Sequence, residues 1–133
     1  MNKHYKKESL NEVAGGDEDF MVVVAQTFLE EIPPDLASME EAIDNDNKEL
    51  TYQFAHKMKP NLEMFGIELA KDIAAIESWT KTNKNKSAIE ENVERIVYTL
   101  SKVFNELKSE KKIGGWGAEV YQKSSLLNLF LVG

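Results

Sequence analysis

Apolar residues recur every three or four positions along most of this chain, which is the period of an amphipathic helix. The most regular set begins at residue 50 and comprises Leu50, Phe54, Met58, Leu62 and Phe65. This spacing predicts a helix from about Lys48 to Phe65. Gly66 follows directly, and glycine allows the left-handed backbone with which many helices end.

His56 lies on the opposite face of this predicted helix. At about 100° per residue, counted from Leu50, the apolar set centres near about 65° and His56 falls near about 240°. The imidazole is therefore predicted to face solvent. Lys59 follows almost one turn later, so its ammonium group is predicted to lie beside the imidazole. Pro60 lacks the N–H that would bond the His56 carbonyl, and we expect the helix to bend there.

Two helices are predicted from the first third of the chain. Residues 8–14 form a short one, and the polar, basic residues 1–7 before it are predicted to be frayed. Asp17 follows two glycines and is a good N-cap for a second helix over residues 17–31. The positions predicted to form the apolar face of this second helix are Phe20, Val23, Val24, Thr27 and Phe28.

The remaining elements are also predicted to be helices. Pro33-Pro34 is expected to end the second helix, because proline has no backbone N–H to donate, and another helix follows over residues 35–44. Apolar periodicity predicts further helices over residues 69–80 and 88–111, the last one with Ser87 as its cap. Because the connections are short, we predict an all-α fold: an antiparallel four-helix bundle with an additional N-terminal helix.

Composition narrows the function classes. The formal charge of −7 argues against nucleic acid and against anionic membrane as partners. The chain has no cysteine, so a disulfide framework, a thiol nucleophile and a cysteine zinc site are excluded. No basic segment followed by an apolar one opens the sequence, and we expect a cytoplasmic protein.

The end of the chain differs from the rest. Residues 1–112 are predicted to form the helical domain and residues 113–133 an apolar extension, since Leu126 to Val132 is almost wholly apolar. Seven residues are too few to span a bilayer. The extension is either a vector-encoded or altered-frame segment or a docking segment, and self-association through it is one expectation.

The residues around His56 resemble the signature of a histidine-containing phosphotransfer (HPt) domain. That signature has the order Ala-His-x-Leu-Lys-Gly and a later Gly. The corresponding residues here are Ala55, His56, Met58, Lys59, Pro60 and Gly66, so that proline replaces the first glycine. Further similar residues are Leu10, Gly15-Gly16-Asp17, Phe20, Phe28 and Ile76-Glu77, and the resemblance covers about residues 8–110.

The resemblance implies that His56 receives a phosphoryl group from the phospho-aspartate of a receiver domain and passes it to another receiver. Imidazole is a good nucleophile near neutral pH, and the ammonium group of Lys59 would stabilise the transferred charge. The expected partners are receiver domains and a hybrid histidine kinase. The receiver would supply Mg²⁺, so no cofactor is expected in this chain. No glycine-rich phosphate loop occurs, and kinase activity is not expected.

Four exposed positions near His56 are candidates for contact with a partner: Gln53, Lys57, Pro60 and Glu63. Gly66 is expected to be structural. One alternative is an HPt-like helical adaptor that binds signalling partners without phosphotransfer. A bundle metalloenzyme fits the sequence less well, because such sites use Glu-x-x-His pairs and position 53 is glutamine.

Overall fold

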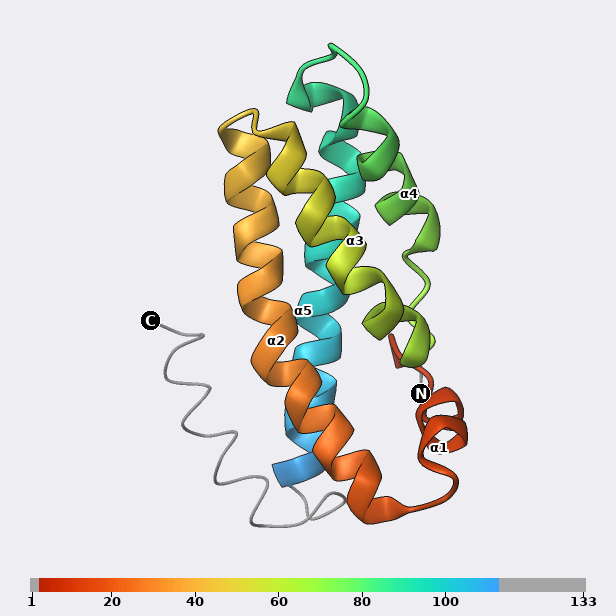
Figure 1. The fold of residues 1–133 in the computed structure, drawn as a ribbon. Coiled ribbons are helices and arrows are strands. Elements are labelled where there is room, and N and C mark those ends of the chain that lie inside the picture. The colour runs from red at the N-terminus through yellow and green to blue at the C-terminus, as the bar shows by residue number, and fades with distance from the viewer. Residues whose placement is uncertain (1–2, 113–133) are drawn as a thin grey trace.

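The structure is a computed structural model that describes residues 3–112, and helices with short connections make up this part of the chain, with no strand in it (Figure 1). The helices are α1 (Lys7–Ala14), α2 (Glu18–Asp44), α3 (Lys48–Met64), α4 (Ala70–Trp79) and α5 (Glu90–Lys112), with a 3₁₀ turn, η1 (Lys86–Ile89), before α5. The prediction of an all-α bundle with an additional N-terminal helix is confirmed. The predicted apolar extension, residues 113–133, lies outside the described residues.

Helices α2 to α5 pack side by side, each antiparallel to the one before it, and α1 lies across one end (Figure 1). Asp17 caps α2 as predicted, because its carboxylate accepts the backbone N–H groups of Asp19 and Phe20. The start of α5 was predicted wrongly. The 3₁₀ turn η1 precedes the helix, and Asn85 caps this turn by accepting the backbone N–H of Ser87.

The double proline does not end a helix. Helix α2 continues through Pro33 and Pro34 to Asp44, so the two predicted helices are one. The prolines leave the carbonyls of the residues four positions earlier without their helical donors. Residues on both sides, among them Ile32 and Leu36, are buried in the same core. Tertiary packing therefore outweighs the local rule, as it does for most helices in proteins.

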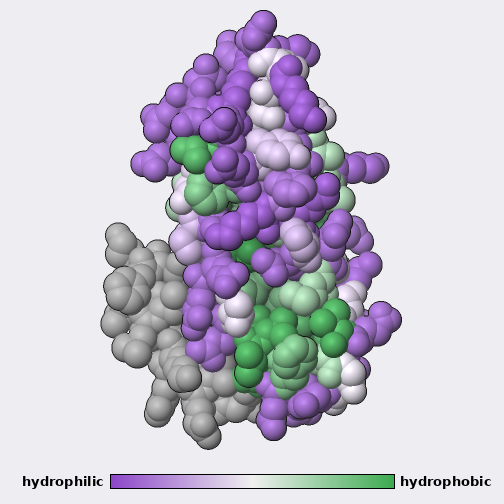
Figure 2. Space-filling view, viewed as in Figure 1, coloured by the Kyte–Doolittle hydropathy of each residue, from purple (hydrophilic) through white to green (hydrophobic). Residues whose placement is uncertain are grey.

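The predicted apolar face of α2 is right at Phe28, which is buried, and wrong near the start of the helix. Phe20 and Val23 are 46% and 57% exposed, whereas Met21, Ala25 and Leu29 are buried. The start of α2 is apolar on nearly all sides, so its periodicity did not fix one face. Hydrophobic side chains gather on the surface at this end of the bundle (Figure 2).

The predicted face of α3 needs one correction as well. Leu50 is exposed and Thr51 is buried in its place, while Met58, Leu62 and Phe65 are buried as predicted. The apolar face therefore begins one residue later than the spacing suggested. His56 still lies on the exposed side.

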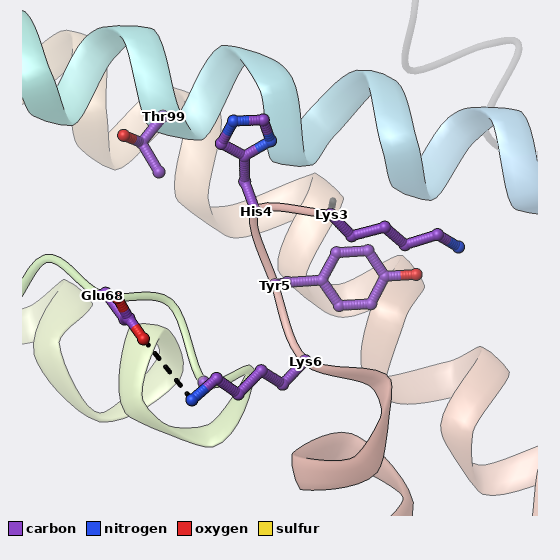
Figure 3. Close-up of a pocket in the computed structure, with 7 residues that line it drawn as sticks. Lys3, His4, Tyr5, Lys6, Glu68 and Thr99 are labelled. Atoms are coloured by element: carbon purple, nitrogen blue, oxygen red, sulfur yellow. Dashed lines mark ion pairs between the residues drawn. The ribbon is translucent and has the colours of Figure 1, made fainter. Parts of the chain in front are cut away.

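Residues 3–6, here called the N-terminal strap, pack against the bundle instead of fraying (Figure 3). Tyr5 is buried beside Phe65, and the backbone N–H of Lys6 donates to the Phe65 carbonyl at 2.8 Å. His4 bonds Glu106 of α5 through its backbone N–H and through Nδ1, at 2.8 and 2.6 Å. The expectation of a frayed segment is therefore wrong for these residues.

Gly66 forms the turn between α3 and α4, and it has the predicted left-handed backbone with φ 64°. A Cβ added here would lie 2.8 Å from Ser9 Oγ and 2.9 Å from Lys6 Cβ. The strap and α1 thus approach this turn so closely that only glycine fits.

Gly66→Ala is expected to destabilise the fold more than Gly15→Ala. Both glycines have φ near 64°, at 64° and 63°, so each alanine adds the strain of a left-handed backbone, about 1–2 kcal/mol. At Gly15 no atom lies within 4 Å of the added Cβ. Urea unfolding of both variants isolates the contribution of the close approach, and equal losses would contradict it.

Tyr5→Phe is expected to remove a pH-dependent loss of stability. Burial, with a smaller contribution from Glu106, raises the pKa of Tyr5 to about 12, from 10.0. The raised pKa means that folding is favoured by the neutral form of Tyr5. This contribution to stability is complete below pH 10 and is lost as the pH rises to about 12. The buried hydroxyl has no hydrogen-bond partner among the described residues, so the variant should be at least as stable at neutral pH.

Urea unfolding of both proteins at pH 7 and pH 11 measures this effect. The free energy of unfolding should fall more between these pH values in the wild type than in Tyr5→Phe, by on the order of 1 kcal/mol. Other groups titrate equally in both proteins and cancel in the comparison. Equal pH dependence would show that the Tyr5 hydroxyl does not titrate in the fold.

Candidate functional site

His56 lies in the middle of α3, and its side chain is 62% exposed, as the sequence predicted. The neighbouring Ala55 and Met58 are fully buried against the other helices. They fix the rotation of α3 about its axis. The position of the imidazole on the outer side of the bundle therefore follows from core packing.

Glu77 of α4 joins the two residues that the sequence singled out. Its Oε2 lies 3.1 Å from His56 Nδ1, and its Oε1 lies 3.5 Å from Lys59 Nζ. The Glu77 side chain is only 15% exposed, and the adjacent Ile76 is buried in the core. One carboxylate, held on a packed helix, therefore orients both the imidazole and the ammonium group.

This contact assigns separate roles to the two ring nitrogens. A carboxylate only accepts hydrogen bonds, so in the neutral imidazole it pairs with a protonated Nδ1. The other nitrogen, Nε2, then carries the free lone pair. An exposed Nε2 with a lone pair is suited to nucleophilic attack on an electrophile brought by a partner.

Tyr52 covers one face of the imidazole. The two rings are nearly parallel, with an interplanar angle of 10° and centroids 5.4 Å apart. Lys81, which follows α4, places its Nζ 5.8 Å from the centre of the Tyr52 ring. The site thus has an aromatic ring on the N-terminal side of His56 and Lys59 on the C-terminal side.

Lys57 does not join this group. Its Nζ lies 3.1 Å from Oδ1 of Asp35, a buried carboxylate on α2, so its charge is paired on the other flank of α3. Gln53, Pro60 and Glu63 are exposed along α3. Pro60 lies inside the continuous helix. Gly66 is about three turns from His56, at the end of α3.

Glu77 and Tyr52 were not predicted as site residues. Tyr52 precedes His56 by four positions, and this spacing places two side chains side by side on a helix, so the sequence contained that signal. Glu77 comes from another helix. Its pairing with His56 depends on how α4 packs on α3, and helical periodicity does not give that register.

Residues 3–112 contain no cluster of three histidine or acidic side chains able to hold a metal ion. Nor does this part of the chain include a helix long and apolar enough to cross a membrane.

A family model described as the Hpt domain matches residues 23–110. This chain belongs to the Hpt domain family. The match covers α3 and α4, and with them His56, Lys59 and Glu77. No curated protein and no solved structure matches the chain. Hpt domains act as phosphotransfer carriers in phosphorelays, where they interact with receiver and kinase domains.

Glu77→Ala is expected to change the tautomer of the His56 imidazole. Without the carboxylate, nothing at Nδ1 favours protonation there, and the proton should be shared with Nε2 as in an exposed imidazole. Nitrogen-15 NMR of the histidine ring, at a pH where it is neutral, reports the two nitrogens separately. Glu63→Ala, which removes an exposed carboxylate from α3, is the control. An unchanged tautomer in Glu77→Ala would contradict the assignment.

Proposed function

We propose that this Hpt domain is a phosphocarrier that receives a phosphoryl group on His56 from the phospho-aspartate of a receiver domain and passes it to a second receiver. The observation that supports this most is the contact of Glu77 with Nδ1 of His56, at 3.1 Å, on an otherwise exposed ring. It leaves Nε2 free on the solvent side, where a partner can reach it.

In the transfer step, the lone pair of Nε2 attacks phosphorus and the N–P bond forms. The bond between phosphorus and the aspartyl oxygen breaks, and its electron pair remains on the receiver's carboxylate. The ring becomes positively charged, and its Nδ1 proton is already directed at Glu77. That contact stabilises the phosphorylated ring by placing a negative charge beside it.

Lys59 has a second role in this proposal. Its Nζ lies 3.5 Å from Glu77 Oε1 in the free protein, a loose ion pair on a side chain that is 38% exposed. The flexible stem of lysine allows the ammonium group to move to the phosphoryl oxygens while Glu77 stays with His56. Lys59 would then stabilise both the transferring and the transferred group.

The metal ion and the phosphoryl groups would come from partner proteins. The receiver would supply Mg²⁺, and a hybrid histidine kinase would supply phosphoryl groups to the relay. The protein itself would have no kinase activity. Gln53, Lys57, Pro60 and Glu63 lie on the same helix as His56 and are the positions that we propose to contact the receiver. Lys57 would present a cation already paired with Asp35.

Phosphotransfer from a phosphorylated receiver domain tests the proposal. We expect label on the wild type and on His4→Gln, and none on His56→Gln. His4 is the matched control, because the chain has two histidines and His4 also contacts a glutamate through Nδ1. The label should be labile in acid and stable in base, as phosphohistidine is.

The adaptor hypothesis predicts a different result. An adaptor would bind receiver domains and carry no label with any of several receivers, and His56→Gln would leave binding and signalling unchanged. Label on His56→Gln equal to that on the wild type would assign the phosphoryl group to another residue.

A further inference from the structure

Two contacts, one helical turn apart on α3, link this helix to α4 and to the turn that follows α4. His56 meets Glu77, and one turn earlier on α3 the ring of Tyr52 lies beside Lys81, which follows Glu77 by four positions. Tyr52 lies four residues before His56, and Lys81 lies four residues after Glu77. The two spacings match because the two segments run antiparallel. Tyr52 is therefore part of the same contact region as the proposed phosphoryl acceptor.

We propose that Tyr52 is a positioning residue for the imidazole of His56, and that Lys81 helps to hold the Tyr52 ring in place. The inference rests on the proposed phosphorylation of His56. It adds a residue from outside the His-x-x-Lys pattern, which the sequence did not assign to the site.

The geometry explains why a second restraint matters. The His56 side chain is 62% exposed, so packing alone does not fix its ring. The bond to Glu77 fixes the position of Nδ1 and still allows the ring plane to swing about that contact. The parallel Tyr52 ring, at 10° and 5.4 Å, limits this swing from one face. Together the two contacts fix the direction of Nε2.

The same contact favours the phosphorylated form. Once phosphorus is bonded to Nε2 and Nδ1 keeps its proton, the imidazole ring carries positive charge. A cationic ring over the face of an aromatic ring is attracted by the ring's quadrupole. The Tyr52 ring is already in the parallel arrangement that this attraction needs, and the hydroxyl group is not required for it.

The chain offers a matched comparison. Tyr98 of α5 also has a histidine neighbour, His4, and a lysine near its ring, with Lys102 Nζ 5.3 Å from the centroid. There the two rings are at 80° and 6.2 Å, edge to face. His4 is held by two contacts with Glu106, so its orientation does not depend on a stacked ring. Tyr98→Leu is therefore the control for Tyr52→Leu.

The test measures phosphorylation of the full chain with two donors, a phosphorylated receiver domain and phosphoramidate, a small donor that needs no docking surface. Tyr52→Leu and Tyr52→Gln should be phosphorylated roughly 3- to 10-fold more slowly with both donors, the range expected for the loss of one aromatic pair. Tyr52→Phe and Tyr98→Leu should remain within about twofold of the wild type. Circular dichroism establishes that each variant is folded.

A second readout tests whether the Tyr52 ring lies against the imidazole of His56. The Tyr52 ring current should displace the proton NMR signals of the His56 ring. This displacement should persist in Tyr52→Phe and disappear in Tyr52→Leu and Tyr52→Gln. Signals that stay at their wild-type positions in Tyr52→Leu and Tyr52→Gln would contradict the stacked arrangement.

The remaining outcomes are distinguishable. A wild type that is labelled by neither donor would overturn the proposed function itself. A labelled wild type with Tyr52→Leu and Tyr52→Gln at the same rate would overturn only the role of Tyr52. Slowing with the receiver alone would place Tyr52 in docking, and slowing in Tyr52→Phe would place the effect in the hydroxyl group. Either result would contradict the positioning role.

Discussion

The turn at Gly66 is the constraint on which the site depends. Its left-handed backbone ends α3 and brings the chain back so that α4 packs along α3. Ser9 and Lys6 lie so close to Gly66 that a side chain at this position would clash with them. The register between the two helices follows from this turn, and the register is what places Glu77 opposite His56. A residue ten positions away in sequence thus influences the hydrogen bond at the His56 ring.

Charge within the site differs from charge in the molecule as a whole. The chain has a formal charge of −7, yet lysines flank the site: Lys57 on the other side of α3, Lys59 beside His56 and Lys81 after α4. Each has a partner in the free protein: a buried carboxylate, the site carboxylate and an aromatic ring. In the proposed transfer, an arriving phosphoryl group would meet cations whose partners are already in place.

Several local signals in the sequence were reliable, although the predicted Ser87 cap was not. Asp17 caps α2, Gly66 is left-handed, and His56 is exposed because the residues beside it are buried. Predictions failed where distant contacts decide. Core packing carries α2 through Pro33-Pro34, and the packing of Tyr5 against Phe65 orders the strap that composition alone suggested would fray. Glu77 belongs to the second kind, since its role arises from the packing of two helices.

The N-terminal strap has a practical consequence for handling the protein. Tyr5 is buried, and His4 is bonded to α5, so the polypeptide just ahead of α1 is an integral part of the folded body. An affinity tag or fluorescent fusion joined directly at Lys3 would disturb these contacts. Through the Lys6–Phe65 hydrogen bond it would also disturb the end of α3. A spacer ahead of residue 3 would leave the contacts of the N-terminal strap with the bundle intact. Surface immobilisation for binding studies needs the same precaution.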